Sequence, residues 1–207
     1  MSQPEILLIG AGGHSHACID AIELQGLYRI AGLVGSADER AQRHLGHPVI
    51  GTDLDLPQLR QRYSRALISV GHIKSPELRI RLFERALELG FEMPVIVSTS
   101  AYVSRHARVG AGTLVMHGAV VNAGAEVGMN CILNSRALVE HDARVADHCH
   151  IATGAILNGS VTVGAGSFVG SGSVLRQGVT IGANCIVGMG LSVRHPQPAH
   201  TIFVGHA

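Results

Sequence analysis

The sequence predicts two parts, an α/β domain over residues 1–97 followed by an all-β parallel β-helix over residues 98–207. Three observations lead to this prediction. Strand-like and helix-like apolar patterns alternate up to residue 97, and an unbroken six-residue repeat runs from residue 101 to residue 196. Aromatic residues make up only 3% of a chain that holds 26 glycines, so the core must consist of small and branched aliphatic side chains. Such a core is typical of repetitive β structures.

The N-terminal part contains four candidate strands and two candidate helices. The strands are EILLI (5–9), YRIAGLV (28–34), RALISVG (65–71) and MPVIVS (93–98). The helices are SHACIDAIELQG (15–26) and SPELRIRLFERALELG (75–90). The second helix opens on Ser-Pro and closes on Gly90, which are common helix boundaries. Strands that alternate with helices predict a small, Rossmann-like parallel sheet.

The C-terminal part divides into sixteen hexads, and the third residue of every hexad is Val, Ile or Leu. The first residue is Ala, Thr, Cys, Ser or Val in all but the last hexad, which begins with Leu191. A six-residue period without insertions indicates a parallel β-helix. Three hexads close one coil, with strands about 4.8 Å apart, and the first and third residues point inward. Gly, Asn and Ala recur at the fourth position, where we expect the corners to need unusual φ angles.

The four cysteines are expected to be inert. Cys131, Cys149 and Cys185 occupy the small, inward first position of their hexads, and Cys18 lies on the apolar face of the first helix. Buried cysteines of this kind behave as small hydrophobic residues. No paired CxxC spacing is present, so we expect free thiols.

Charge and hydropathy exclude several classes of partner. Sixteen basic and fifteen acidic residues nearly balance, and no basic run is available to follow a phosphate backbone, so nucleic acid is not expected as a partner. The first apolar stretch, EILLIGAGG, lacks a basic leader and breaks into glycines. It therefore predicts neither a signal peptide nor a membrane span, and we expect a cytoplasmic protein without membrane insertion.

Three histidines lie close together in the segment ALVEHDARVADHCHIATGAILNG (137–159), namely His141, His148 and His150. A zinc site needs three or four converging ligands, and these residues lie on different hexads with different orientations. We therefore expect no metal. His150 is at the second position of its hexad and is expected to face outward, one side of the triangle away from His141.

His141 is the strongest candidate for chemistry in this segment. Residues eighteen apart should stack in successive coils, so His141 lies over Ala123 on one side and Gly159 on the other, and these small neighbours leave a shelf beside the ring. The flanking carboxylates in Glu-His-Asp can fix the tautomer of the imidazole and raise its basicity, as a general base requires. Plain surface decoration is the alternative.

The hexads resemble those of the left-handed β-helix acyltransferases. The segment NSRALVEHDARVADHCHIATGAILNGSVTVG, together with GAGGH near the start of the chain, is similar to the bacterial family of sialic acid O-acetyltransferases and nucleotide 4-amino-sugar N-acetyltransferases. This resemblance covers almost the whole chain. It implies left-handed coils, although parallel crossovers are otherwise right-handed, and a homotrimer with acetyl-CoA in the groove between neighbouring β-helices.

The resemblance also implies roles for individual residues. His141 matches the general base, Asp142 matches the acid that orients it, and His150 matches a histidine that contacts the acceptor or the acetyl group. Positions matching the acetyl-CoA groove are His150, Gly159, Gly170 and Ser171.

The segment GAGGHSH (10–16) follows a predicted strand and precedes a predicted helix, as phosphate-binding turns do. A nicotinamide cofactor would predict GxGxxG and an acid after the second strand, where this chain has Gly35 and Ser36, so NAD is not expected. The resemblance implies instead that this turn binds the nucleotide of a sugar substrate, and the matching residues are Gly12, Gly13 and His14. Gly71, at the end of the third predicted strand, is a further candidate substrate-binding residue.

Two departures from the family pattern affect the expected ligands. Family members usually carry an acid after the second strand as well, so its absence leaves room for a nucleotide other than UDP or for a free sugar. The chain stops at VGHA, without the short basic tail of the family, and we expect this to weaken a contact with CoA or between subunits.

The sequence therefore predicts an acetyl-CoA-dependent acetyltransferase without a metal. The expected acceptor is the amine of a nucleotide-linked 4-amino-4,6-dideoxy sugar, used for surface polysaccharide or glycan synthesis. The expected chemistry is direct transfer with His141 as the base. Two alternatives stay open: O-acetylation of a sialic acid, and a trimeric sugar-binding scaffold without catalysis.

Overall fold

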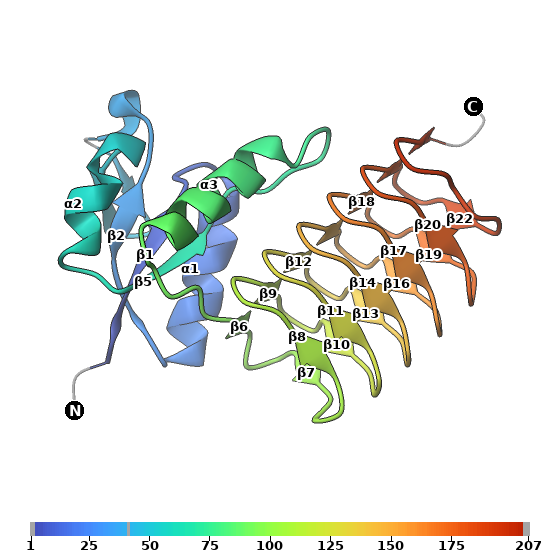
Figure 1. Ribbon diagram of the computed structural model, residues 1–207. Helices are drawn as coiled ribbons and strands as arrows, with labels where there is room; N and C mark the ends of the chain where they lie inside the picture. Colours follow the sequence, from blue (N-terminus) through green and yellow to red (C-terminus); the bar gives the residue numbers. More distant parts are fainter. Residues whose placement is uncertain (1–2, 41, 205–207) are drawn as a thin grey trace.

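The computed structural model describes residues 3–40 and 42–204, and shows an α/β domain beside a stack of β-coils (Figure 1). The last three residues of the VGHA terminus lie outside the described residues. The coils begin next to the α/β domain and continue to the far end of the molecule, where the C-terminus lies. No helix in the described part of the chain is long and apolar enough to cross a membrane.

The N-terminal sheet has five strands in the order β3-β4-β2-β1-β5. Three of them were predicted: β1 (Glu5–Ile9), β2 (Arg29–Val34) and β5 (Arg65–Ile68). β1 pairs in parallel with both β2 and β5, which confirms the predicted parallel sheet. Long apolar strands of this kind are readable from sequence because both of their faces are buried.

Five shorter elements of this domain were not predicted. They are β3 (Arg43–His44), β4 (His47–Gly51), two 3₁₀ helices η1 (Ala37–Glu39) and η2 (Asp53–Asp55), and α2 (Leu56–Arg60). β3 and β4 form an antiparallel hairpin, and β4 pairs in parallel with β2. Elements of two to five residues are too short to carry a readable period.

Two helices cover opposite faces of the sheet. α1 (His14–Gln25) packs on the face that carries Ile6 and Leu8, and α3 (Glu77–Glu88) packs on the face that carries Leu7 and Ile9. This division follows from the alternation of side chains along β1. Both helices agree with their predicted ranges, and α1 ends at Gly26, whose φ of 68° is in the left-handed region.

The fourth predicted strand belongs to a different sheet. The range 93–98 contains only β6 (Ile96–Val97), which pairs with β9 of the β-helix and not with the N-terminal sheet. Ile96 lies opposite Leu114, eighteen residues later, so β6 has the spacing of the coils. Its assignment to the α/β sheet was wrong because a short apolar run alone does not specify its partner.

The β-helix consists of three parallel sheets of two-residue strands. The first contains β7 (Tyr102–Val103), β10 (Val120–Val121), β13 (Leu138–Val139), β16 (Ile156–Leu157), β19 (Val174–Leu175) and β22 (Ser192–Val193). The second contains β8 (Arg108–Val109), β11 (Glu126–Val127), β14 (Arg144–Val145), β17 (Thr162–Val163) and β20 (Thr180–Ile181). The third contains β6, β9 (Leu114–Val115), β12 (Ile132–Leu133), β15 (His150–Ile151), β18 (Phe168–Val169), β21 (Ile186–Val187) and β23 (Ile202–Phe203). Val121 pairs with Val139, which confirms the eighteen-residue coil.

The interior of the β-helix is filled by the first and third residues of the hexads. Ala137 and Val139 are typical members of this cluster, with relative exposures of 1% and 0%. Cys131, Cys149 and Cys185 are buried in the same cluster, and Cys18 is buried on the inner face of α1. All four are free, as predicted from their positions.

The corners differ from the prediction in one respect. Positive φ occurs at the sixth position of the hexads, for example 75° at Gly124 and 59° at Asp142, and not at the fourth. Glycine recurs at the fourth position for another reason, because the backbones of successive coils approach closely at these glycines. A Cβ on Gly110 would lie 2.6 Å from the carbonyl carbon of Gly128 in the next coil.

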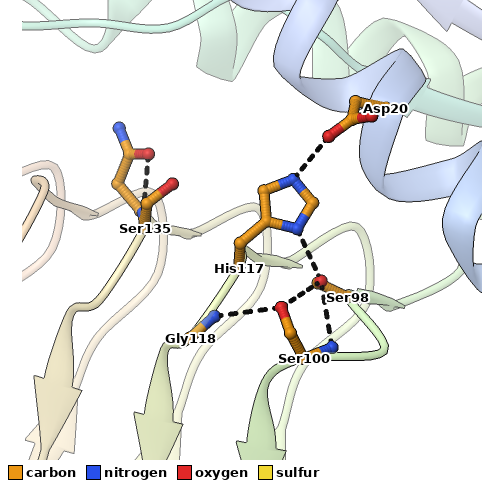
Figure 2. Close-up of polar contacts among 7 residues, drawn as sticks. Asp20, Ser98, Ser100, His117, Gly118 and Ser135 are labelled. Atoms are coloured by element: carbon orange, nitrogen blue, oxygen red, sulfur yellow. Dashed lines mark hydrogen bonds and ion pairs between the residues drawn. The ribbon is translucent and has the colours of Figure 1, made fainter.

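The two domains share a core and a set of polar contacts. Ile96, Leu114 and Met116, on the outside of the first coils, are buried in the cluster between α1 and the sheet. Beside them, His117 Nε2 lies 2.9 Å from Asp20 Oδ2 of α1, and Nδ1 accepts a hydrogen bond of 2.7 Å from Ser98 Oγ (Figure 2). These contacts fix α1, and the glycine turn before it, against the β-helix.

Candidate active site

His141 lies on the corner that follows β13. Its side chain is 57% exposed, and Nδ1 donates a hydrogen bond of 2.9 Å to Oδ2 of Asp142. This bond fixes the proton on Nδ1, so Nε2 carries the free lone pair of the neutral ring. The left-handed φ of Asp142 brings its carboxylate back toward the ring, and Asp and Asn tolerate that conformation better than most residues.

The surrounding charges favour protonation of this imidazole. The hydrogen bond to Asp142 raises the pKa of His141, and the negative charges of Asp142 and Glu140 add to the effect. Glu140 is itself held in place, because Oε2 accepts hydrogen bonds from Asn122 Nδ2 (2.9 Å) and from the backbone N–H of His141 (3.2 Å). The result is an exposed, oriented and relatively basic imidazole.

Gly159 lies directly beside the ring of His141, one coil further on. A Cβ at residue 159 would lie 2.6 Å from Nε2 and 2.7 Å from Cε1 of His141. The backbone N–H of Ser160 donates to the His141 carbonyl at 3.0 Å, which keeps the two coils in register. The sequence predicted a free shelf over Gly159, but the ring of His141 itself lies there. Gly159 leaves room for the ring because it has no side chain.

A cavity of about 420 Å³ lies between the N-terminal domain and β15. This volume is in the range of small-molecule sites. Its lining residues are Gly12, Gly13, His14, Ser69, Val70, Gly71, His72, Ile73 and His150. All five residues that the sequence suggested as substrate contacts, Gly12, Gly13, His14, Gly71 and His150, line this one cavity.

The glycine turn and the turn after β5 form the N-terminal wall of the cavity. An added Cβ at Gly12 or Gly13 would meet no atom within 4 Å, so the backbone there is open to a ligand. Gly71 approaches the ring of His14, and a Cβ at residue 71 would lie 3.5 Å from it. Both turns follow the carboxyl ends of neighbouring parallel strands, where ligands bind in open α/β sheets.

His150 forms the β-helix side of the cavity. Its side chain points out of the coil, as expected, but the N-terminal domain covers it, and only 7% of the residue is exposed. Nδ1 donates to the carbonyl oxygen of His72 at 2.7 Å, and Asn134 Nδ2 donates to Nε2 at 3.3 Å. These two bonds specify the neutral tautomer with the proton on Nδ1.

Two more histidines face His150, and burial keeps all three neutral. Burial is the main reason that the pKa of His150 and of His14 falls to about 4, and that of His72 to about 3. The His150 ring centroid is 6.4 Å from that of His14 and 5.5 Å from that of His72. Sequence reasoning missed His72, Ser69, Val70 and Ile73, although their position after a buried parallel strand was a usable signal.

The candidate residues lie on three separate surfaces of one chain. His141, Asp142 and Gly159 belong to the corner after β13 and β16, His150 belongs to the cavity, and Gly170 and Ser171 belong to the corner after β18. His148 packs elsewhere, against the ring of Phe83 at 5.8 Å. Among the described residues, no group of three His, Cys, Asp or Glu side chains is arranged to bind a metal ion.

Two features define the class of hexapeptide-repeat acyltransferases. One is the cavity lined by a glycine turn, and the other is a hexapeptide β-helix that carries an oriented surface histidine. Comparison with known proteins narrows this class. Residues 5–86 match the model of the PglD N-terminal domain, and residues 160–194 match that of the hexapeptide repeat of succinyl-transferase. The comparison with curated proteins found no match.

Solved structures cover nearly the whole chain. PerB from Caulobacter crescentus, in complex with CoA and GDP-perosamine, is 36% identical over 96% of this chain and 92% of its own, with a TM-score of 0.89. The acetyltransferase domain of PglB from Neisseria gonorrhoeae, in complex with acetyl coenzyme A, is 32% identical over 96% and 95%, with a TM-score of 0.88. WeeI from Acinetobacter baumannii, 21% identical over 94% of each chain with a TM-score of 0.83, shares the fold.

The chain therefore belongs to the family of PglD-like bacterial sugar acetyltransferases, which use acetyl-CoA. This confirms the family that the Glu-His-Asp segment and the hexads indicated.

Proposed function

We propose that this enzyme transfers the acetyl group of acetyl-CoA to the amine of a nucleotide-linked 4-amino-4,6-dideoxy sugar. The observation that carries the proposal is the cavity, because one pocket joins the glycine turn of the α/β domain to His150 of the β-helix. A relative that is 36% identical has been solved with GDP-perosamine and CoA. The absence of an acid at Gly35 and Ser36 is compatible with a nucleotide other than UDP.

The exposed His141 supports direct transfer with general base catalysis. The free Nε2 of His141 would take the proton from the attacking amine, while Asp142 holds the ring through Nδ1. Acetyl-CoA supplies the acetyl group as a thioester, whose C–S bond breaks as the C–N bond forms. The proton on Nε2 can then return to the departing thiolate, so the imidazole ends the cycle neutral.

The corners that follow β12, β15 and β18 form a column suited to the extended arm of CoA. Ser135, Thr153 and Ser171 stack there in successive coils, and none has a large side chain. Figure 2 shows Ser135 in this column, one coil beyond His117. Gly170 allows the backbone of Gly188 to approach closely, which keeps the corner after β18 flat.

A homotrimer would bring these surfaces together. His141 and the cavity lie on different parts of one chain, so the base of one subunit would serve the cavity of its neighbour, with acetyl-CoA between the two β-helices. Acetyl-CoA and nucleotide sugars are cytoplasmic metabolites, and we place the reaction in that compartment. The product would serve surface polysaccharide or glycan synthesis.

The decisive experiment is an acceptor screen. GDP- and UDP-linked 4-amino-4,6-dideoxy sugars are incubated with acetyl-CoA, and thiol release is measured together with the product mass. We expect thiol release with a gain of one acetyl group per sugar. The matched control is the same nucleotide sugar with a hydroxyl in place of the amine. Turnover of sialic acid alone would indicate O-acetylation, and no turnover of any acceptor would indicate a binding scaffold.

A further inference from the structure

Arg79 is a buried cation at the junction of the two domains. It lies in the first turn of α3 and is only 1% exposed. Among the fully buried side chains of the described residues it is the largest. Nη1 donates hydrogen bonds to the carbonyl oxygens of Ile68 (2.7 Å) and Val70 (2.8 Å). Nε donates to the carbonyl oxygen of Asn130 in the β-helix at 3.1 Å.

These bonds hold the wall of the cavity. Ile68 and Val70 flank Ser69 at the carboxyl end of β5, and both Ser69 and Val70 line the cavity. Asn130 is a corner residue of the β-helix, and its Nδ2 donates back to the Arg79 carbonyl at 3.4 Å. The guanidinium therefore fixes the turn after β5 to the coil that faces it.

The charge of Arg79 is not neutralised within the described residues. No carboxylate there forms an ion pair with it, and Nη2 is buried without a hydrogen-bond partner. Burial lowers the pKa of Arg79 only to about 10, so the group is charged at neutral pH. A buried charge without a counterion is costly, and such charges are usually paired or serve a ligand.

The field of this charge reaches the cavity. Burial is the main reason that the pKa of His14 and of His72 is lowered. The charge of Arg79 is the next cause for His14, and for His72 it comes after the effect of His150. The cavity lining contains no carboxylate, and its three imidazoles are neutral. An anion that enters the cavity would therefore experience the positive charge behind its wall without opposition from the lining.

We propose that Arg79 is a positioning residue for a diphosphate, which fixes the turn after β5 and supplies buried positive charge without touching the ligand. This inference rests on the proposed function, because the diphosphate is that of the nucleotide sugar. The glycine turn would make the direct contacts, through backbone N–H groups. Arg79 would act through Ser69 and Val70 and through its field.

The test compares ligands that differ only in phosphate charge. Calorimetric Kd values for guanosine, GMP and GDP, and for the uridine series, are measured with the wild type, Arg79→Gln and Arg79→Lys. Arg85→Gln is the matched control, because Arg85 is an exposed arginine of the same helix. We expect Arg79→Gln to raise the Kd for GDP or UDP by about tenfold or more, which corresponds to about 1.4 kcal/mol. The Kd for the nucleoside should change by less than about twofold. Arg79→Lys should retain most of the diphosphate affinity.

A purely structural role of Arg79 gives a different pattern. Equal weakening of nucleoside and diphosphate in Arg79→Gln, or equal loss in Arg79→Lys and Arg79→Gln, would overturn the proposal. If Arg79→Gln does not fold, the wild type still decides, since a wild type that binds the nucleosides but binds GDP and UDP no more tightly than them also overturns the proposal. Failure of the proposed function looks different: the wild type then binds neither nucleotide, while binding of inorganic pyrophosphate still tests Arg79.

Discussion

The imidazole of His141 occupies the space that a side chain at Gly159 would need, since an added Cβ there would lie 2.6 Å from Nε2, and Gly159 is eighteen residues later in the chain and one coil further along the β-helix. The ring position therefore depends on two contacts, Asp142 on the Nδ1 side and Gly159 beside Nε2. The first contact fixes the tautomer, and the second leaves room for the ring because Gly159 has no side chain. Both can be tested separately.

Gly159→Ala should lower activity by displacing the ring of His141, because the new methyl group would lie within 3 Å of it. We expect kcat to fall by about tenfold or more with little change in Tm, since His141 is exposed and can move away. The double variant Gly159→Ala/His141→Ala should be no worse than His141→Ala alone. Additive losses would mean that residue 159 acts on something other than the ring.

His141→Ala should lower kcat by a factor of about 10² to 10⁴, with little effect on binding of either substrate or on Tm. The reason is that proton transfer matters chiefly in the transition state. His106→Ala is the matched control, because His106 is another exposed histidine on a β-helix corner. Steady-state kinetics on heat-stable, correctly assembled protein provide the measurement. A His141→Ala rate within about threefold of the wild type would remove His141 as the base.

The rate should depend on pH through His141. A base works in its neutral form, so activity should be full above the pKa of His141 and fall as the pH decreases through it. Asp142 raises this pKa, so Asp142→Asn should move the acidic limb to lower pH while also lowering the maximal rate. Profiles of kcat/KM for the two proteins give the comparison. An unchanged limb in Asp142→Asn would assign the titration to another group.

Cys149→Ala should retain most of the activity, within about twofold in kcat. Cys149 is enclosed in the β-helix, and its hydrogen bond with Cys131, together with burial, raises its pKa well above the usual value. A buried, protonated thiol is not a nucleophile. Mass spectrometry after incubation with acetyl-CoA should detect no acetylated protein. An acetyl-cysteine that passes its acetyl group to the sugar would replace direct transfer by a covalent mechanism.

Mixed assemblies should recover activity from two inactive variants. His141→Ala removes the base and His14→Ala alters the cavity, and these residues lie on different surfaces of one chain. If neighbouring subunits share each site, co-expressed variants form some sites with an intact base and an intact cavity. We expect measurable activity in the mixture and almost none in either variant alone. A mixture as inactive as its components would place the complete site within one subunit.

The sequence by itself determined the β-helix and its interior. The six-residue period predicts coils of eighteen residues because each hexad forms one strand and one corner, and the register of Val121 with Val139 agrees. It also specified the stacking of His141 over Gly159, since both positions follow from the same period. Burial of the four cysteines follows from local pattern in the same way.

Local pattern was insufficient where a short segment could pair in two ways. β6 reads as a strand in either domain, and only its pairing with β9 assigns it to the β-helix. The glycine that recurs at the fourth position of the hexads likewise has two explanations, and the close approach of Gly110 to Gly128 decides between them. The six-residue period alone does not specify which position of the hexad adopts a positive φ angle.

Only the tertiary structure decided how the cavity is built. His14, His72 and His150 are far apart in the sequence, and they meet because α1 buries its apolar face against the first coils of the β-helix. The same packing removes water from these imidazoles and lowers their pKa values, so residues that look like titrating histidines in the sequence are neutral in the protein. Arg79 reads as one polar position of an amphipathic helix, and only the carbonyl oxygens of Ile68, Val70 and Asn130 make it a buried cation, because they converge from two domains.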